Sequence, residues 1–328
     1  MTWVIWRQYR LQTVITAAIF AVYAAVVLVT GLDVASQWHS ILVSCAGSQQ
    51  CLQQQQLGNV LGNDARVLSD MVPALIGLFW GAPLVAHEIE AGTTGFAWTQ
   101  GVTRRRWLYT KIGWILLAAA IWGGAVSALV TWWSGPFNAS RQNLFQPNTF
   151  DQQFLVPVGY AVFATALGIC AGTVLRRTLP AMAVVIGVFI GIRVGISQYL
   201  RQHFLPAVTH YYTLGGSFSP PAGSWILSQG ITGPALAVPG NVTSAGWDGI
   251  PASALPASCQ ALIPNGPGSA AQAQAINACI RNAHIRAFFS YQPADRFWAF
   301  QGIETGIYLL LAIALVFVAA RVLLRRDA

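Results

Sequence analysis

Six apolar runs, each about the 20 residues needed to cross a lipid bilayer, limit the folds open to this chain. Lipid offers no hydrogen-bond partner to backbone groups, so each run should form a helix. Pro73 and Pro83 in the second run suit a helix that bends. We therefore predict an all-α integral membrane protein with transmembrane helices at Thr13–Leu32, Val67–Ala86, Ile112–Trp133, Phe154–Leu175, Leu179–Leu200 and Ala299–Ala320.

The low content of charged residues supports lipid as the solvent. Charged residues make up 9% of the chain, against about 25% in soluble proteins. The net charge of +8 could suggest a nucleic-acid partner. However, the basic residues are scattered at the ends of apolar runs, and no basic tract with interleaved aromatic residues occurs. We therefore expect a lipid bilayer and no nucleic acid as partner.

The distribution of arginine and lysine predicts the orientation. Short segments on one side of the membrane carry most of them, and such segments are usually cytoplasmic. Both termini are then cytoplasmic and the protein lies in the plasma membrane, with an amphipathic interfacial helix at Met1–Gln12 and a tail at Arg321–Ala328. The dense side holds Arg7, Arg10, Arg104, Arg105, Arg106, Lys111, Arg176, Arg177, Arg321, Arg325 and Arg326.

Four of the five cysteines fall on the opposite side, in the segments predicted to be external at Asp33–Arg66 and Arg201–Trp298. The third external segment is 134–153. An oxidising compartment favours two disulfides, Cys45–Cys51 and Cys259–Cys279. Pairing across the two loops stays open, and a metal site is the rival interpretation, although no histidine lies at ligand spacing beside either pair.

The long segment Arg201–Trp298 is expected to form a small external domain. Turn signals such as Pro220-Pro221 and Pro239-Gly240 predict that most of it is irregular. The stretch Ala270–Phe289 has a helical apolar period. The disulfides and the apolar run Trp225-Ile226-Leu227 favour an ordered domain over a disordered loop.

The most densely charged stretch, His87–Lys111, lies between the second and third apolar runs; we call it the polar segment. It contains Glu88-x-Glu90-x-Gly92-Thr93, then Gly101-Val102-Thr103-Arg104, and then Lys111. This pattern resembles the cytoplasmic loop of type-2 ABC exporter permeases, Glu-x-Glu-x-Gly-Thr, Pro-Val-Ser-Arg and Gly-Lys. The departures are Gly101 for proline and Thr110 for glycine. The alternative is a plain loop whose arginines flank helix ends.

The resemblance implies the membrane half of an exporter that docks on a separate ATPase. Two permeases, as a homodimer or heterodimer, would join two ATPase subunits, which would hold ATP and magnesium, and this chain would hold no cofactor. The residues expected to couple to the ATPase are Glu88, Glu90, Gly92, Thr93, Arg104, Arg105, Arg106 and Lys111. The only lysine follows threonine and precedes isoleucine, so the chain lacks the Gly-Lys-Ser/Thr of a phosphate-binding loop.

Within the spans, Arg193 and Glu304 are candidates for function, because a charge at membrane depth is costly. We predict that they form a pair or share a water-filled pocket, either as a structural ion pair or on the substrate path. Asp33, Asp64, Asp70 and Asp151 are expected to be solvated. Two glycine patterns should pack against other helices, namely Gly187, Gly191 and Gly195 in the fifth span and Gly168 and Gly172 in the fourth.

The expected substrate is hydrophobic or amphipathic, a drug, lipid or peptide. The alternative is a membrane-embedded enzyme or sensor that acts through the external domain. Its candidate residues are scattered, at His203, His210, His284 and Asp295. A channel would need polar rings along several spans, and Arg193 and Glu304 alone qualify.

Overall fold

The computed structural model describes residues 2–45, 60–90, 104–135, 144–213, 218–234, 242–243, 255–263 and 269–326. The chain divides into two compact units. The helical unit consists of Met1–Arg141, Gln146–Arg201 and Trp298–Ala328, and the sheet unit consists of Gln142–Phe145 and Gln202–Phe297.

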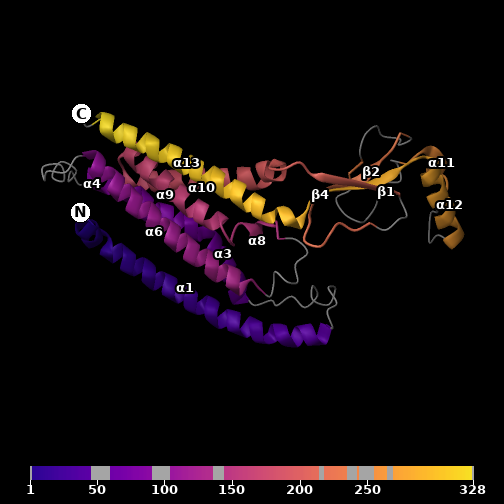
Figure 1. Ribbon diagram of the computed structural model, residues 1–328, viewed down its shortest axis with the longest axis horizontal. Helices are drawn as coiled ribbons and strands as arrows, with labels where there is room; N and C mark the ends of the chain where they lie inside the picture. The colour runs from indigo at the N-terminus through magenta and orange to yellow at the C-terminus, as the bar shows by residue number, and fades with distance from the viewer. Residues whose placement is uncertain are drawn as a thin grey trace. The chain divides into compact units, whose positions relative to one another are not determined.

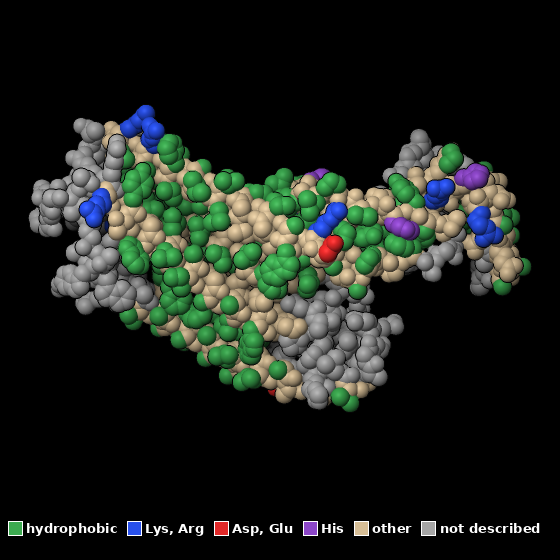
Figure 2. Space-filling model, viewed as in Figure 1, with side chains coloured by type: hydrophobic (Ala, Val, Ile, Leu, Met, Phe, Trp, Pro, Cys, Tyr) green, Lys and Arg blue, Asp and Glu red, His purple; other side chains and the backbone are tan. Residues whose placement is uncertain are grey.

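Six helices in the described residues are long and apolar enough to cross a membrane, which confirms the predicted fold class. Figure 2 shows hydrophobic side chains over most of the visible flank of the helical unit, with basic side chains at the end that holds the C-terminus. The candidate spans are Val14–Asp33, Val67–His87, Leu108–Trp133, Val156–Leu175, Thr178–His203 and Ala294–Arg325.

The first helix, α1 (Thr2–Cys45), is longer than the sequence predicts (Figure 1). It runs without a break through the expected interfacial helix, the first span and the start of the next loop. No proline occurs between residues 2 and 45, so the backbone has no local reason to stop at either expected boundary.

Polar contacts attach α1 to the next two spans. The indole nitrogen of Trp80 donates to the hydroxyl of Thr16 at 3.1 Å, and that of Trp133 donates to Thr30 at 3.2 Å. Buried indole N–H groups need such acceptors. These bonds fix where α1 lies along its neighbours.

The second span consists of three pieces, α3 (Val60–Ile76), a π-helical turn η1 (Gly77–Gly81) and α4 (Ala82–Glu90). A Cβ atom at Gly77 would lie 2.5 Å from the carbonyl oxygen of Ala164, so a side chain there would clash with the next-but-one span. Glycine at this position therefore allows two backbones to approach closely.

The third span is α6 (Arg104–Trp133), and the fourth is α9 (Val156–Leu175), which follows a short helix α8 (Pro147–Phe150). Helix α9 is buried along most of its length. An apolar core joins α4, α6, α9 and the last helix, α13 (Phe297–Arg326), through residues such as Leu84, Ile112, Ile169 and Ala320. The centre of the helical unit is therefore α9.

Gly168 and Gly172 on α9 lie against the second span. A Cβ atom at Gly168 would be 2.5 Å from the carbonyl oxygen of Gly77, and one at Gly172 would be 2.6 Å from that of Ala82. These distances are too short for a side chain, so both glycines serve close helix packing.

The fifth span combines α10 (Thr178–Gly195), a π-helical turn η2 (Ile196–Leu200) and a 3-10 turn η3 (Arg201–His203). Its buried face, which carries Ala181, Val185 and Phe189, packs against the other helices of the helical unit. The glycine pattern at Gly187, Gly191 and Gly195 has no atom of the described residues within 4 Å of its Cβ positions. The packing partner expected for these glycines is thus not found in the described part of this chain.

The described residues of the sheet unit form four antiparallel strands in the order β1-β4-β2-β3. The strands are β1 (Val208–Thr213), β2 (Trp225–Thr232), β3 (Val242–Thr243) and β4 (Arg286–Gln292). The sequence analysis expected most of this segment to be irregular and did not predict these strands. The helix predicted at Ala270–Phe289 is α12 (Ala270–Asn282), which ends before β4 begins.

A disulfide joins Cys259 in α11 (Ala257–Gln260) to Cys279 in α12, with a Cα–Cα distance of 5.7 Å. This predicted pair is confirmed. The cross-link joins the two helices within an apolar core that also contains Ile231 of β2, Ile280 and Ile285. The predicted Cys45–Cys51 disulfide lies outside the described residues.

Candidate functional site

Three buried charged side chains of the helical unit meet at Arg201, which lies in η3 at the end of the fifth span. Its Nε and Nη2 atoms donate to the two carboxylate oxygens of Glu304 on α13, both at 2.8 Å. Nη2 also donates to Asp151, which follows α8. Arg201 is 1% exposed and Glu304 is 0% exposed. This two-point contact with a carboxylate is the strong geometry of an arginine pair.

A second arginine extends this cluster towards the second span. Arg193 on α10 donates through Nη2 to Oδ1 of Asp70 at 2.5 Å and through Nη1 to the Asp70 carbonyl oxygen at 3.0 Å. Its Nη2 also lies 3.4 Å from Oδ2 of Asp151. Asp151 therefore contacts both guanidinium groups. We call Asp70, Asp151, Arg193, Arg201 and Glu304 the ionic network.

Two sequence-based predictions need correction. Arg193 and Glu304 were expected to pair with each other or to share a water-filled pocket. The direct pair is wrong, because Arg193 binds Asp70 and Asp151 while Glu304 binds Arg201. Asp70 and Asp151 were expected to be solvated, yet both lie in ion pairs and Asp151 is buried. Burial of carboxylates is far cheaper beside guanidinium groups than without them, which explains this arrangement.

Neutral side chains complete the hydrogen bonding of the ionic network. The hydroxyl of Tyr160 on α9 donates to Glu304 at 2.7 Å, and the side-chain amide of Gln152 donates to Asp70 at 2.9 Å. Each carboxylate of the network thus accepts hydrogen bonds from at least two residues. Buried polar groups require such partners.

Gln301, one turn before Glu304 on α13, fixes the start of α9. Its side-chain oxygen accepts from the backbone nitrogens of Leu155 and Val156 at 3.2 and 3.0 Å, and its nitrogen donates to the carbonyl oxygen of Phe150 at 3.0 Å. The first backbone N–H groups of a helix have no partner within the helix. Gln301 supplies that partner and holds α13 against α9.

The charges of the ionic network do not balance. Three carboxylates and two guanidinium groups give a net charge of −1 when all are ionised. Asp70 has 35% of its side chain exposed, so water can stabilise the unbalanced charge there. Burial raises the pKa of Asp151, and the guanidinium groups of Arg201 and Arg193 oppose that rise.

A π-helical turn brings both arginines to one face. Eight residues of regular α-helix would place Arg193 and Arg201 roughly 80° apart. The turn at Ile196–Leu200 accommodates about one extra residue, which reduces the difference to roughly 20°. The sequence interpretation missed Arg201 because it placed the residue in a loop; its spacing from Arg193 alone did not reveal the shared face.

Glu90, at the end of α4, makes the other notable polar contact. Its two carboxylate oxygens accept from the backbone nitrogen of Thr178 at 3.0 Å and from its hydroxyl at 2.7 Å. These hydrogen bonds lower the pKa of Glu90. Thr178 is the first residue of α10, so Glu90 stabilises the start of that helix, where a negative charge is favoured.

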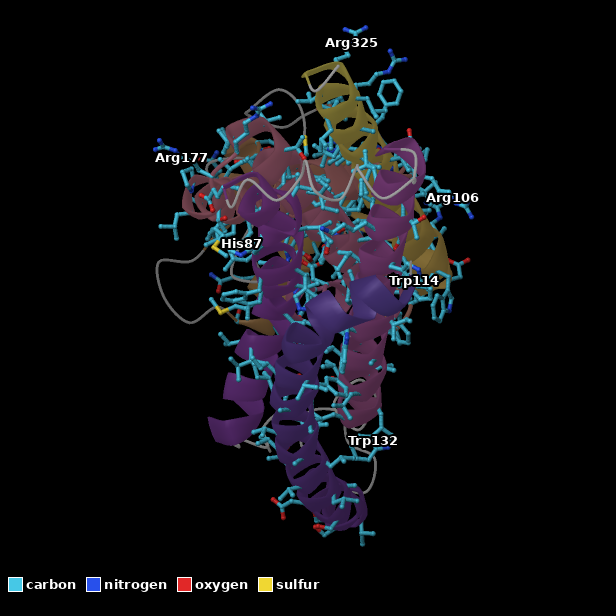
Figure 3. The ribbon with its side chains drawn as sticks, turned by 90° about the vertical axis from the view of Figure 1, so that its left-hand side faces the viewer. His87, Arg106, Trp114, Trp132, Arg177 and Arg325 are labelled. Carbon is cyan, nitrogen blue, oxygen red and sulfur yellow. A yellow bond between two sulfur atoms is a disulfide. The ribbon has the colours of Figure 1, made fainter. Side chains whose placement is uncertain are left out.

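The other residues of the polar segment have different environments. Lys111 is 1% exposed and so does not present a free surface for an ATPase contact. Arg106 is exposed at the start of α6. Figure 3 shows His87 on α4, Arg106 on α6 and Arg325 on α13, with Arg177 between α9 and α10, on this side of the helical unit.

Several predicted coupling residues cannot be placed in detail. Gly92 and Thr93 lie outside the described residues, and Glu88, Arg104 and Arg105 lie in helices whose side chains at these positions are not described. No group of three or more His, Cys, Asp or Glu side chains within the described ranges could hold a metal ion.

Comparison with known proteins identifies the family. Residues 17–201, just over half of the chain, match the family model described as ABC-2 membrane transporter related. No curated protein and no solved structure matches the chain. The matched range contains nearly all of the first five spans, the polar segment and both arginines of the ionic network. The chain therefore belongs to the ABC-2 membrane transporter related family and is a multi-pass membrane permease of an ABC transporter.

Proposed function

We propose that the protein is the membrane subunit of an ATP-driven exporter in the plasma membrane. It moves a hydrophobic or amphipathic substrate, a drug, lipid or peptide, out of the cell. The family membership carries this proposal. The sequence lacks a Gly-Lys-Ser/Thr phosphate-binding loop, because its single lysine lies between Thr110 and Ile112. A separate ATPase subunit therefore supplies the energy.

The ATPase docks at the polar segment, on the cytoplasmic side with both chain termini. The exposed Arg106 supports this site, together with the arginines that precede it in the same helical turn. Arg104, Arg105 and Arg106 attract acidic groups of the ATPase. Lys111 contributes through its buried position in α6 rather than through direct contact.

Two permeases and two ATPases form the working assembly, with the substrate path between the permeases. The exposed glycine pattern of α10 supports contact with a second permease, because Gly187, Gly191 and Gly195 leave room for another helix. The ionic network closes the external end of each permease. Arg193 and Glu304 then act through the network, where their charges are neutralised by neighbours rather than by substrate.

Purification in mild detergent from the native host, followed by mass spectrometry, tests this function. We expect a stoichiometric partner that carries Gly-x-x-x-x-Gly-Lys-Ser/Thr, and ATP-dependent transport by the purified complex in vesicles. If no ATPase accompanies the protein while a control transporter keeps its own, the proposal fails. The sheet unit would then become the place to seek an enzymatic or sensory function.

A matched pair of variants tests the docking site. Arg104→Glu/Arg106→Glu reverses two charges in the polar segment, and Arg321→Glu/Arg325→Glu reverses two at the end of α13. We expect the first variant to lose the ATPase subunit and the second to retain it. Equal retention by both variants would contradict docking at the polar segment.

A further inference from the structure

Helix α10 and its two following turns form one continuous element, Thr178–His203, that acidic residues of other elements hold near both ends. Glu90 of α4 binds Thr178 at the start. Asp70, Asp151 and Glu304 bind its two arginines, Arg193 and Arg201, in the second half. The two sets of contacts therefore act on opposite halves of one continuous helical element.

We propose that Glu90 is a positioning residue for transport, which transmits movement of the polar segment through α10 to the ionic network. This inference rests on the proposed function, because it assumes that an ATPase moves the polar segment. It assigns Glu90 to the permease's own helix α10, instead of to contact with basic residues of the ATPase.

The position of Glu90 makes it suited to this task. It is the last residue of α4, so a displacement of residues 91–103 acts on it directly. Both of its carboxylate oxygens are bonded to Thr178, one through the backbone. Two charge-assisted hydrogen bonds at the start of a helix constrain both the distance and the relative orientation of the carboxylate and the helix. A displacement of Glu90 is therefore transmitted to the start of α10.

The surroundings of α10 allow it to move as a unit. One face packs on the helical unit through Ala181, Val185 and Phe189. Gly187 and Gly191 on the other side have no described neighbour. Packed helices can slide or tilt past one another with small changes at their interfaces, as in shear motions, so α10 can also move where this face meets a second permease.

The ionic network can follow such a movement without isolating a charge. Arg193 binds Asp70 at 2.5 Å and approaches Asp151 at 3.4 Å, while Asp151 already binds Arg201. Arg193 can therefore transfer its hydrogen bonds between Asp70 and Asp151. A buried carboxylate left without its guanidinium would be far more costly, so exchange is the lower-energy route.

The experiment uses the complex of permease and ATPase. Spin labels at Leu155→Cys and Tyr199→Cys mark exposed positions beside the ionic network on the start of α9 and in η2. The same protein without these two cysteines gives the background. Distances are measured with ADP and after trapping with ATP and vanadate. We expect trapping to shift the distance distribution in the otherwise unchanged protein.

Two threonine variants provide a matched test of Glu90. Thr178→Val removes a hydroxyl that binds Glu90, whereas Thr110→Val removes one that binds the Arg106 carbonyl oxygen of its own helix. We expect Thr178→Val and Glu90→Ala to reduce the ATP-dependent shift and transport, and Thr178→Val to keep the ATPase subunit and its hydrolysis. Thr110→Val should retain the full shift.

Three results would overturn the inference. They are a full shift in Glu90→Ala, equal effects of the two threonine variants, or loss of the ATPase subunit from Glu90→Ala with no effect of Thr178→Val, since Glu90 would then act by docking. If Glu90→Ala does not fold, the comparison of Thr178→Val with Thr110→Val still tests whether the Glu90–Thr178 contact transmits the movement. Failure of the proposed function would give a different result, because no ATPase subunit would then co-purify with the unmodified permease.

Discussion

Helices α9 and α10 follow each other in the chain and look alike in sequence, but they occupy opposite environments. Both are apolar, and both carry glycines four residues apart. In the fourth span, 83% of the most apolar stretch is buried, against 22% in the fifth. The glycines of α9 touch backbone of the second span, and those of α10 touch no described atom.

The two helices are held in place by different kinds of contact. Helix α9 is fixed by packing along its whole length, with Gln301 at its start and an apolar core at its end. Helix α10 packs on one face and is tied by polar contacts at Thr178, Arg193 and Arg201. Substitutions of packing atoms and of charges should therefore affect them differently.

The largest effect on stability is expected for Arg201→Met. It leaves the buried carboxylates of Glu304 and Asp151 without their main partner, which should lower the free energy of unfolding by about 3–5 kcal/mol. Arg193→Met should cost less, because Asp70 is partly exposed to water. Unfolding in detergent measures both. Recovery in Arg201→Met/Glu304→Met would support the ion pair as the cause, and equal losses in the two arginine variants would contradict it.

The next prediction compares Tyr160 and Tyr308, whose ring centroids lie 4.6 Å apart. Tyr160→Phe removes a hydrogen bond to Glu304 and should cost about 1.5–3 kcal/mol. The buried hydroxyl of Tyr308 has no hydrogen-bond partner among the described residues. Tyr308→Phe should therefore leave stability unchanged or raise it. A larger loss in Tyr308→Phe, measured by the same unfolding assay, would show that its hydroxyl has a bound partner.

The glycine comparison predicts a smaller but clearer contrast. Gly168→Ala places a methyl group against the backbone of Gly77 and Ala82 and should cost about 1–3 kcal/mol. Gly191→Ala meets no described atom and should be neutral or stabilising by about 0.5–1 kcal/mol in the isolated chain. Thermal unfolding of both variants tests this. If Gly191→Ala destabilises the assembled transporter alone, the α10 face contacts another subunit.

The smallest effect on stability is expected for Glu90→Gln, since the Glu90–Thr178 contact is exposed to solvent. Hydrogen bonding lowers the pKa of Glu90 in the folded protein. The ionised group therefore stabilises the fold at neutral pH, and this contribution is lost as the pH falls through the lowered pKa. Unfolding midpoints of the two proteins should differ slightly at pH 7 and converge in acid. Divergence in acid would contradict this sign.

The sequence predicted the helical unit well because the bilayer imposes a length on every span. The six runs agree with the candidate spans to within a few residues at most ends, apart from the longer last helix. The same reasoning failed at α1, where apolarity marks the part in lipid but not where the helix ends.

Prediction was weaker in the sheet unit. Ile276, Ile280, Ala283 and Ala287 have a helical period, but the helix stops at Asn282 and Ala287 lies in β4. The aromatic run at residues 286–292 pairs with β1 on one side and β2 on the other. Pairing with distant strands overrides a local period, and a single sequence does not reveal those partners.

The sequence alone determined the membrane class, the six spans, the polar segment and the Cys259–Cys279 pair, because each depends on apolar length, local charge or cysteine spacing. Only the tertiary structure decided that Arg193 meets Asp70, 123 residues away, and that Arg201 meets Glu304, 103 residues away. It also decided which glycines are covered. A charge buried among helices must find an opposite charge at the same depth and on the facing side, and both conditions depend on how the helices pack.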